Sequence, residues 1–191
     1  MTKMYITDCT RIMNEQSIEH LLPRLERNRQ KKIRAERIIQ KKAQHAAAGL
    51  LLFHHFGHIN DLEYNEYGKP YLADRSAYIS ISHSQQWVVL AVSSTEIGAD
   101  IQVVSPIRPG VLRRCFTDEE CEYIGKDSKR FTQLWTRREA YAKFTGRGLT
   151  APLSQFIPDI PYCEGEHQNA FYTVFGDSSV QLIQVNLKDL L

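Results

Sequence analysis

Residues 78–104, YISISHSQQWVVLAVSSTEIGADIQVV, carry the strongest β-strand signal in the chain. Three runs rich in Val, Ile and aromatic residues follow one another here, at residues 78–82, 87–93 and 96–104. Only short gaps separate the runs, and strands joined by short turns pair most simply with their neighbours in sequence. The stretch therefore predicts an antiparallel meander of three strands.

Helical segments flank this β region. Upstream, a short strand is expected at residues 4–7 and a long helical stretch at residues 17–56. Pro23 interrupts that stretch, because proline lacks the amide hydrogen that a helix interior needs. Downstream, Thr117 and Glu120 have the spacing of a capping box, which predicts that a helix begins just after Thr117.

The remaining elements complete a repeated pattern. YGKP at residues 67–70 predicts a turn, residues 129–145 predict a helix that ends at Gly146, and residues 171–175 and 180–185 predict a closing hairpin around GDSS. The order strand, helix, strands thus occurs twice. We predict an α+β protein of two similar halves, residues 1–104 and 105–191, packed as one compact unit.

The composition fits a soluble globular protein: 42% of the 191 residues are hydrophobic and 24% are charged. No apolar run approaches the roughly 20 residues that a membrane span needs, and the amino terminus lacks the apolar stretch of a secretory signal. We therefore expect no membrane association and a cytoplasmic location. The four cysteines form no CxxC pair, which favours free thiols.

Positive charge gathers near the amino terminus, although the formal net charge is only +2. Residues 24–42 contain nine Lys and Arg residues against Glu26 and Glu36. Such a segment attracts nucleic acid, a phosphorylated ligand or an acidic protein, and the plain alternative is a solvated helix face. The segment has no aromatic residue on which bases could stack, which argues against a single-strand nucleic-acid module.

Candidate catalytic residues lie in two places. Trp135, Glu139 and Lys143 are spaced four apart, so a helix presents them on one face, although an isolated pair of this kind is usually an ordinary ion pair. Asp100 follows Gly98, which allows close backbone approach, and Gln102 points to the same side of the strand. Asp100 and Glu139 could supply oxygen ligands to a hard cation such as Mg²⁺.

Four motifs in this order resemble those of a known family: YGKP at 67–70, ISHS at 81–84, GAD at 98–100 and WTRREAYAKFTGRGL at 135–149. Together they are similar to the 4′-phosphopantetheinyl transferases of the larger, monomeric, surfactin-synthetase-activating type. The resemblance runs from about residue 67 to 153. It implies a pseudo-two-fold pair of halves, each a small antiparallel sheet with a long helix, and an active site between them.

The resemblance also implies an activity and its participants. Coenzyme A would be the substrate, Mg²⁺ or Mn²⁺ the metal, and an acidic acyl or peptidyl carrier protein the acceptor of the 4′-phosphopantetheine arm on a serine. The protein would act without nucleic acid or membrane.

Residue roles follow from the same resemblance. Asp100 and Glu139 would bind the metal, with Gln102 as a neutral third ligand, and Glu139 would also take the proton of the carrier serine. Lys143 would contact the diphosphate. The residues that would hold the 3′-phosphoadenosine end are Lys69, Pro70, Ser82 and His83.

Three positions depart from the family pattern. Gln102 stands where an acid is common, which predicts weaker metal binding. His45 is followed by Ala46 instead of an arginine, so Lys31, Lys32 or Lys41 would have to reach the nucleotide phosphate. Arg138 stands where lysine is commoner, which keeps the charge but changes its geometry.

Two rival interpretations stay open at this stage. The first is a family member that has lost turnover and only binds coenzyme A or a carrier protein, which Gln102 and the missing helix arginine motivate. The second is a nucleic-acid-binding module built on residues 24–42, whose binding should depend steeply on salt. A zinc site at His54, His55 and His58 is a further possibility, although no cysteine or glutamate of suitable spacing accompanies them.

Overall fold

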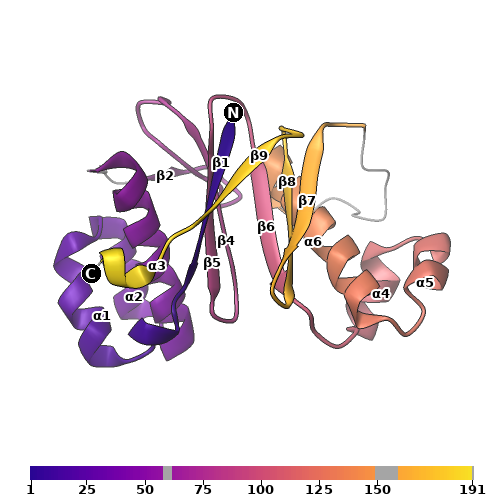
Figure 1. The fold of residues 1–191 in the computed structure, drawn as a ribbon, viewed down its shortest axis with the longest axis horizontal. Helices are drawn as coiled ribbons and strands as arrows, with labels where there is room; N and C mark the ends of the chain where they lie inside the picture. The colour runs from indigo at the N-terminus through magenta and orange to yellow at the C-terminus, as the bar shows by residue number, and fades with distance from the viewer. Residues whose placement is uncertain (58–61, 149–158, 191) are drawn as a thin grey trace.

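The protein is built from layers of helices and sheets, seen here in a computed structural model that describes residues 1–57, 62–148 and 159–190. A four-stranded sheet has the order β4-β5-β1-β9, a three-stranded sheet has the order β6-β8-β7, and β2 with β3 forms a small hairpin. Helices α1–α3 cover the outer face of the first sheet, and α6 covers the outer face of the second (Figure 1). The α+β class predicted from the sequence is confirmed.

The first half of the chain supplies most of the first sheet. Its elements are β1 (Thr2–Asp8), η1 (Thr10–Ile12), α1 (Glu15–Leu21), η2 (Leu22–Arg24), α2 (Arg27–Ala35), α3 (Ile39–Phe56), β2 (Glu63–Tyr64), β3 (Pro70–Tyr71), β4 (Tyr78–Ser84) and β5 (Trp87–Ser93). The rest of the chain supplies β6 (Gly98–Val103), α4 (Pro109–Cys115), α5 (Asp118–Ile124), α6 (Ser128–Thr145), β7 (Tyr162–His167), β8 (Ala170–Phe175), β9 (Val180–Gln184) and η4 (Leu187–Leu190).

Local signals predicted several elements correctly. The capping box of Thr117 and Glu120 is present at the start of α5. Helix α6 ends at Gly146, whose left-handed backbone (φ 67°) suits a residue without a side chain. Strands β4 and β5 pair antiparallel in register, as the first two runs of the meander predicted.

The long amino-terminal helix was predicted wrongly, because the chain forms three helices there. Pro23 lies in η2, as expected of an interruption, but a second break separates α2 from α3. At that break the Glu36 carboxylate accepts hydrogen bonds from the backbone amides of Arg37 (2.8 Å) and Ile38 (3.0 Å). A carboxylate that accepts from these two amides competes with the α2 carbonyls to which they would bond if the helix continued, and this explains the break.

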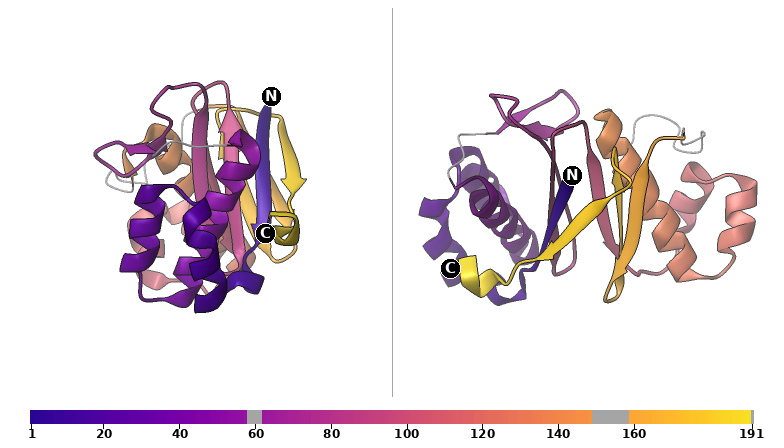
Figure 2. Two further views of the ribbon diagram at one scale, coloured as in Figure 1. Left: turned by 90° about the vertical axis from the view of Figure 1, so that its left-hand side faces the viewer. Right: turned by 45° about the horizontal axis from the view of Figure 1, so that its top comes forward.

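The strand pairing from β6 onward also differs from the prediction. Strand β6 does not extend the meander but pairs antiparallel with β8, which also pairs with β7. Strand β9 forms no hairpin with β8; it crosses to the first sheet and runs parallel to β1, beside which it lies in a tilted view (Figure 2). The carboxyl-terminal segment 180–190 therefore packs on the first half of the molecule.

Three apolar clusters hold these layers together. One lies between α1–α3 and the first sheet, one lies between the two sheets, and a smaller one joins α4 and α5 to α6. The middle cluster fixes β6 against the first sheet, so residues from both halves can meet at their junction.

Within the described residues, no helix is long and apolar enough to cross a membrane.

Candidate active site

Asp100 lies at the junction of the two sheets, on β6, and is 1% exposed. Its Oδ1 accepts hydrogen bonds from Ser82 Oγ (2.5 Å) and Lys143 Nζ (2.6 Å), and its Oδ2 accepts one from Gln102 Nε2 (2.9 Å). Charge-assisted bonds of this kind fix a carboxylate in one orientation. β4 thus meets α6 at the Asp100 side chain.

Glu139 lies one helical turn before Lys143 on the same face of α6. Burial, and after it the Asp100 charge, raise the pKa of its carboxyl to about 7 against the opposing effect of Lys143 and Arg108. Among the described residues no hydrogen bond to the Glu139 carboxylate is found. The structure thus brings together Asp100, Glu139 and Lys143, which are far apart in sequence, and leaves one carboxylate open to a ligand.

The two carboxylates suit a hard cation. Asp100 raises the pKa of Glu139 because two neighbouring negative charges repel each other, and a divalent ion between them would remove that repulsion. In the described part of the chain, no group of three or more His, Cys, Asp or Glu side chains is placed to hold a metal. Asp100 and Glu139, with the Gln102 amide beside them, therefore fit a metal whose other ligands come from substrate and water.

A pocket of about 300 Å³ opens in front of these residues. Its wall combines the site acids, Lys143 and Gln102 with Ser82 and His83 from β4 and with side chains of the amino-terminal helices. The His45 and His83 rings meet edge to face, with centroids 5.8 Å apart. Burial and neighbouring cations lower the pKa of both histidines to about 4, so both are neutral at pH 7.

The basic segment contributes two cations to this pocket, Arg29 and Lys32, which lie one helical turn apart on α2. Lys32 had been singled out from the sequence, but Arg29 had not. Lys31 lies beside them in sequence but is exposed and does not line the pocket. The structure therefore separates two predicted candidates that the sequence treated alike.

Arg29 is buried, with 5% of its surface exposed, and contacts from two helices hold its guanidinium in place. Its Nη1 donates to the His45 carbonyl (3.3 Å), and its Nε lies 3.3 Å from a Glu26 carboxylate oxygen. An added Cβ at Gly49 would lie 2.7 Å from Arg29 Cδ, so the bare glycine makes room for the arginine. The sequence signal that could have found Arg29 is the i,i+3 spacing of Glu26 and Arg29 opposite this glycine.

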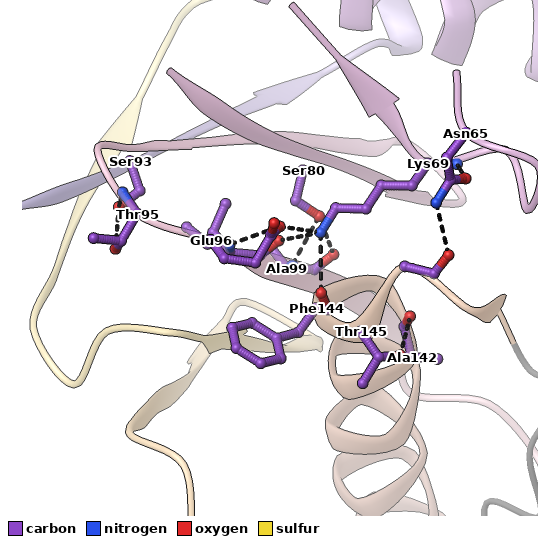
Figure 3. A network of polar contacts seen from close by, with 12 residues as sticks. Asn65, Lys69, Ser80, Ser93, Thr95, Glu96, Ala99, Ala142, Phe144 and Thr145 are labelled. Atoms are coloured by element: carbon purple, nitrogen blue, oxygen red, sulfur yellow. Dashed lines mark hydrogen bonds and ion pairs between the residues drawn. The ribbon is translucent and has the colours of Figure 1, made fainter. Parts of the chain in front are cut away.

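A second pocket of about 250 Å³ adjoins the first and shares Gly68, Pro70, Ile81, Glu139 and Lys143 with it. Lys69 and Pro70, both predicted to hold the nucleotide end, lie in its wall. The Lys69 ammonium forms an ion pair with Glu96 and donates to the carbonyls of Ile97 and Phe144 (3.1 Å each) (Figure 3).

These contacts give Lys69 a structural task. An ammonium has three donors, and these three acceptors use them all. The Phe144 carbonyl belongs to the last turn of α6, where carbonyls lack helical partners and attract positive charge. Asn65 reinforces the contact by donating to the Gly146 carbonyl (2.8 Å). Lys69 thereby fastens the β2–β3 hairpin to the end of α6, and a nucleotide role would require its ammonium to leave these acceptors.

Arg138 faces away from the pocket and is 3% exposed. Its guanidinium forms an ion pair with Glu120 and lies over the Phe116 ring, 4.7 Å from the centroid. A planar guanidinium can stack and pair at once, which an ammonium cannot do equally well. Arg138 thus joins α6 to the capping residue of α5, and its neighbour Glu139 faces the pocket.

The predicted zinc site at His54, His55 and His58 is not supported by the two histidines that the structure describes. His55 Nδ1 is 2.7 Å from the Tyr5 hydroxyl, and the His54 ring packs edge to face on Tyr5. His58 lies outside the described residues. His54 and His55 therefore pack α3 against Tyr5 of β1.

A family comparison covers the segment that carries Asp100, Glu139 and Lys143. Residues 96–181 match the model of the 4′-phosphopantetheinyl transferase superfamily. This segment is therefore similar to that superfamily. The motifs had predicted the same relationship, and that prediction is confirmed.

Named relatives of this superfamily agree. The 4′-phosphopantetheinyl transferase gsp of Aneurinibacillus migulanus is 39% identical over 102 residues, 50% of this chain and 42% of the relative. The 4′-phosphopantetheinyl transferases ffp of Bacillus subtilis and Sfp of Bacillus subtilis strain 168 are 37% and 38% identical over 97 residues, 48% of this chain and 43% of each relative. The chain thus matches less than half the length of these relatives.

Proposed function

We propose that this protein transfers the 4′-phosphopantetheine arm of coenzyme A to a serine of an acyl or peptidyl carrier protein and releases 3′,5′-ADP. The observation that carries the proposal is the meeting of Asp100, Glu139 and Lys143 at one cation-lined pocket. Much of that site lies in the segment that matches the superfamily model. The relatives are named for the same transfer.

Coenzyme A would bind by its phosphates. Arg29 and Lys32 offer positive charge at the end of the pocket formed by the helices, and His45 and His83 offer neutral ring nitrogens beside them. Among the described residues Lys143 Nζ donates to Asp100 alone, so two of its three donors are available to diphosphate oxygens. This division directs the 3′-phosphate toward α2 and the diphosphate toward α6.

The transfer depends on alignment and on charge. The carrier serine oxygen attacks the phosphorus that bears the pantetheine arm, the bond from that phosphorus to the 3′,5′-ADP oxygen breaks, and the serine proton passes to Glu139. A carboxylate with a pKa near 7 suits a general base at neutral pH. Lys143 stabilises the negative charge that grows on the departing phosphate. A bound Mg²⁺ or Mn²⁺ would neutralise the diphosphate oxygens next to Asp100 and Glu139.

The proposal includes the setting of the reaction. Exposed basic residues on and beside α2, among them Arg27, Lys31 and Arg34, would attract an acidic carrier protein. All four cysteines are free thiols, as expected of a cytoplasmic protein. Because one chain supplies both sides of the pocket, a monomer suffices, and residues 1–104 and 105–191 would be its two pseudo-symmetric halves.

The experiment is intact-mass spectrometry of an apo carrier protein incubated with this protein, coenzyme A and Mg²⁺. The carrier should gain the mass of one phosphopantetheine arm, and a Glu139→Gln variant should give no gain on the same timescale. Glu122→Gln, the same change at an exposed carboxylate of α5 outside the pocket, serves as the matched control and should modify the carrier at the normal rate.

A protein that only binds coenzyme A is the alternative, because Gln102 replaces a common acid of the family pattern. It predicts no mass gain on any of several acyl and peptidyl carriers, with Mg²⁺ or Mn²⁺, while coenzyme A still binds in a calorimeter. That pair of results would replace the transferase proposal.

A further inference from the structure

Three alternate serines of β4 face the free edge of β6. Ser80 Oγ accepts a hydrogen bond from the Ala99 amide (2.8 Å), Ser82 Oγ from the Ile101 amide (3.4 Å) and Ser84 Oγ from the Val103 amide (2.9 Å). β4 and β6 thus run side by side in the same direction, and every second residue of β4 contacts every second residue of β6. We call this row of contacts the serine ladder.

The serine ladder replaces a backbone sheet ladder between the two halves. Strand β6 pairs with β8 along one edge, so the amides of Ala99, Ile101 and Val103 point from the other. Buried amides of an edge strand must find acceptors, and here side-chain hydroxyls provide them. The position of β6 relative to β4 is therefore set by three serine side chains.

Ser82 extends the ladder to the active site. It is 4% exposed, and its hydroxyl donates to Asp100 Oδ1 at 2.5 Å while accepting from the backbone next to Asp100. A serine hydroxyl has a single proton to donate. That proton is engaged by Asp100, so Ser82 has none left for a phosphate oxygen, although its side chain borders the pocket.

We propose that Ser82 and Ser84 are positioning residues, which hold Asp100 in the place and orientation at which it meets a metal ion with Glu139. The sequence pattern had suggested a nucleotide contact for Ser82 and no role for Ser84. This inference rests on the proposed function only for the identity of the reaction. The ladder and its effect on metal affinity can be measured without any carrier protein.

The two roles for Ser82 differ in what its removal changes. Hydrogen-bonded supports of metal ligands alter metal affinity by roughly 10–100-fold when they are removed. A phosphate contact would instead change the KM for coenzyme A. Ser82→Ala and Ser84→Ala should therefore both weaken Mn²⁺ binding, whereas the KM for coenzyme A at saturating Mg²⁺ should stay within about twofold of the wild-type value.

Ser93→Ala is the matched control. Ser93 is also a buried serine of the first sheet, 7% exposed, but its hydroxyl bonds to Thr2 and Thr95, away from β6. Ser93→Ala loses a comparable hydrogen bond, so it reports any general loss of stability. Its Mn²⁺ affinity should equal that of the wild type.

The experiment measures free Mn²⁺ by electron paramagnetic resonance in the presence of coenzyme A, together with amide hydrogen exchange by NMR. In the wild type the Ile101 and Val103 amides should exchange slowly, and Ser84→Ala should accelerate Val103 and lower Mn²⁺ affinity about tenfold. Ser84→Thr, which keeps a hydroxyl, should restore both. Should Ser82→Ala not fold, the half-buried Ser84 still tests the ladder.

Other results would overturn the inference. Fast exchange of both amides in the wild type would show that the ladder does not exist. An increased KM for coenzyme A with unchanged Mn²⁺ affinity in Ser82→Ala would make Ser82 a ligand contact. If the wild type binds Mn²⁺ with these properties and yet modifies no carrier, the proposed function fails and the positioning role stands.

Discussion

Replacing Gly98 by alanine should disturb the site without touching any of its charged groups. Gly98 begins β6 and packs directly on α6: an added Cβ would lie 2.1 Å from the Phe144 nitrogen and 2.3 Å from the Ala140 carbonyl oxygen. Both atoms are helix backbone and cannot rotate away. The helix and strand must then separate by roughly 1.3 Å, the difference from the 3.4 Å at which ordinary van der Waals contact begins.

The separation should lower both the thermal stability and kcat, each by an amount that can be worked out. Overpacking of a tight core costs typically about 1–3 kcal/mol, and backbone contacts place Gly98→Ala at the upper end, about 3 kcal/mol. For a chain of this length that loss corresponds to a decrease in Tm of about 6–12 °C. Asp100 lies on β6 while Glu139 and Lys143 lie on α6, so a shift of about 1 Å should also reduce kcat by about 100-fold.

The assay pairs thermal unfolding with carrier modification, and Gly110→Ala is the control. An added Cβ at Gly110 meets nothing within 4 Å, and alanine is the better helix former by up to about 1 kcal/mol, so Tm should stay or increase slightly. A Gly98→Ala protein with the Tm and kcat of the wild type would refute the reasoning, because β6 and α6 could not then be packed so closely.

Three further predictions concern charge. In EDTA, the stability of the wild type should decrease as pH increases from about 4.5 to 7, because the raised pKa of Glu139 favours its neutral form in the folded state. Glu139→Gln should therefore be more stable than the wild type at pH 8, by up to about 3 kcal/mol in urea unfolding, and equal to it at pH 4; a gap independent of pH would contradict this. Gln102→Glu should reduce the Mg²⁺ concentration for half-maximal activity several-fold, and an unchanged requirement would show that position 102 is remote from the metal. Lys32→Ala should increase the KM for coenzyme A about tenfold while Lys31→Ala leaves it unchanged, and equal effects would mean that α2 acts only through its net charge.

Local structure was predictable because its causes lie within a few residues. The capping box at Thr117 acts over three residues, and the end of α6 needs only a residue that accepts a left-handed backbone at Gly146. The face shared by Glu139 and Lys143 follows from helical spacing alone. The local prediction that failed, a helix continuing past Glu36, overlooked a competing local contact between that carboxylate and the next two amides.

Strand pairing was not predictable in the same way. Nearness in sequence favoured β6 beside β5 and β9 beside β8, but both choices were wrong. Ser80, Ser82 and Ser84 alternate along β4, so the inner face of that strand is polar and bonds to the amides of β6 through its side chains. The alternation was visible in the sequence; which strand would lie opposite was not, because that depends on how the two sheets pack.

The basic segment shows a further limit of sequence reasoning. Counting charges there favours the exposed lysines, yet the pocket receives Arg29, whose guanidinium is buried. A buried arginine needs a counter-charge and room, and Glu26 and Gly49 supply them from two different helices. The pocket thus receives an arginine from α2 although none follows His45 on α3.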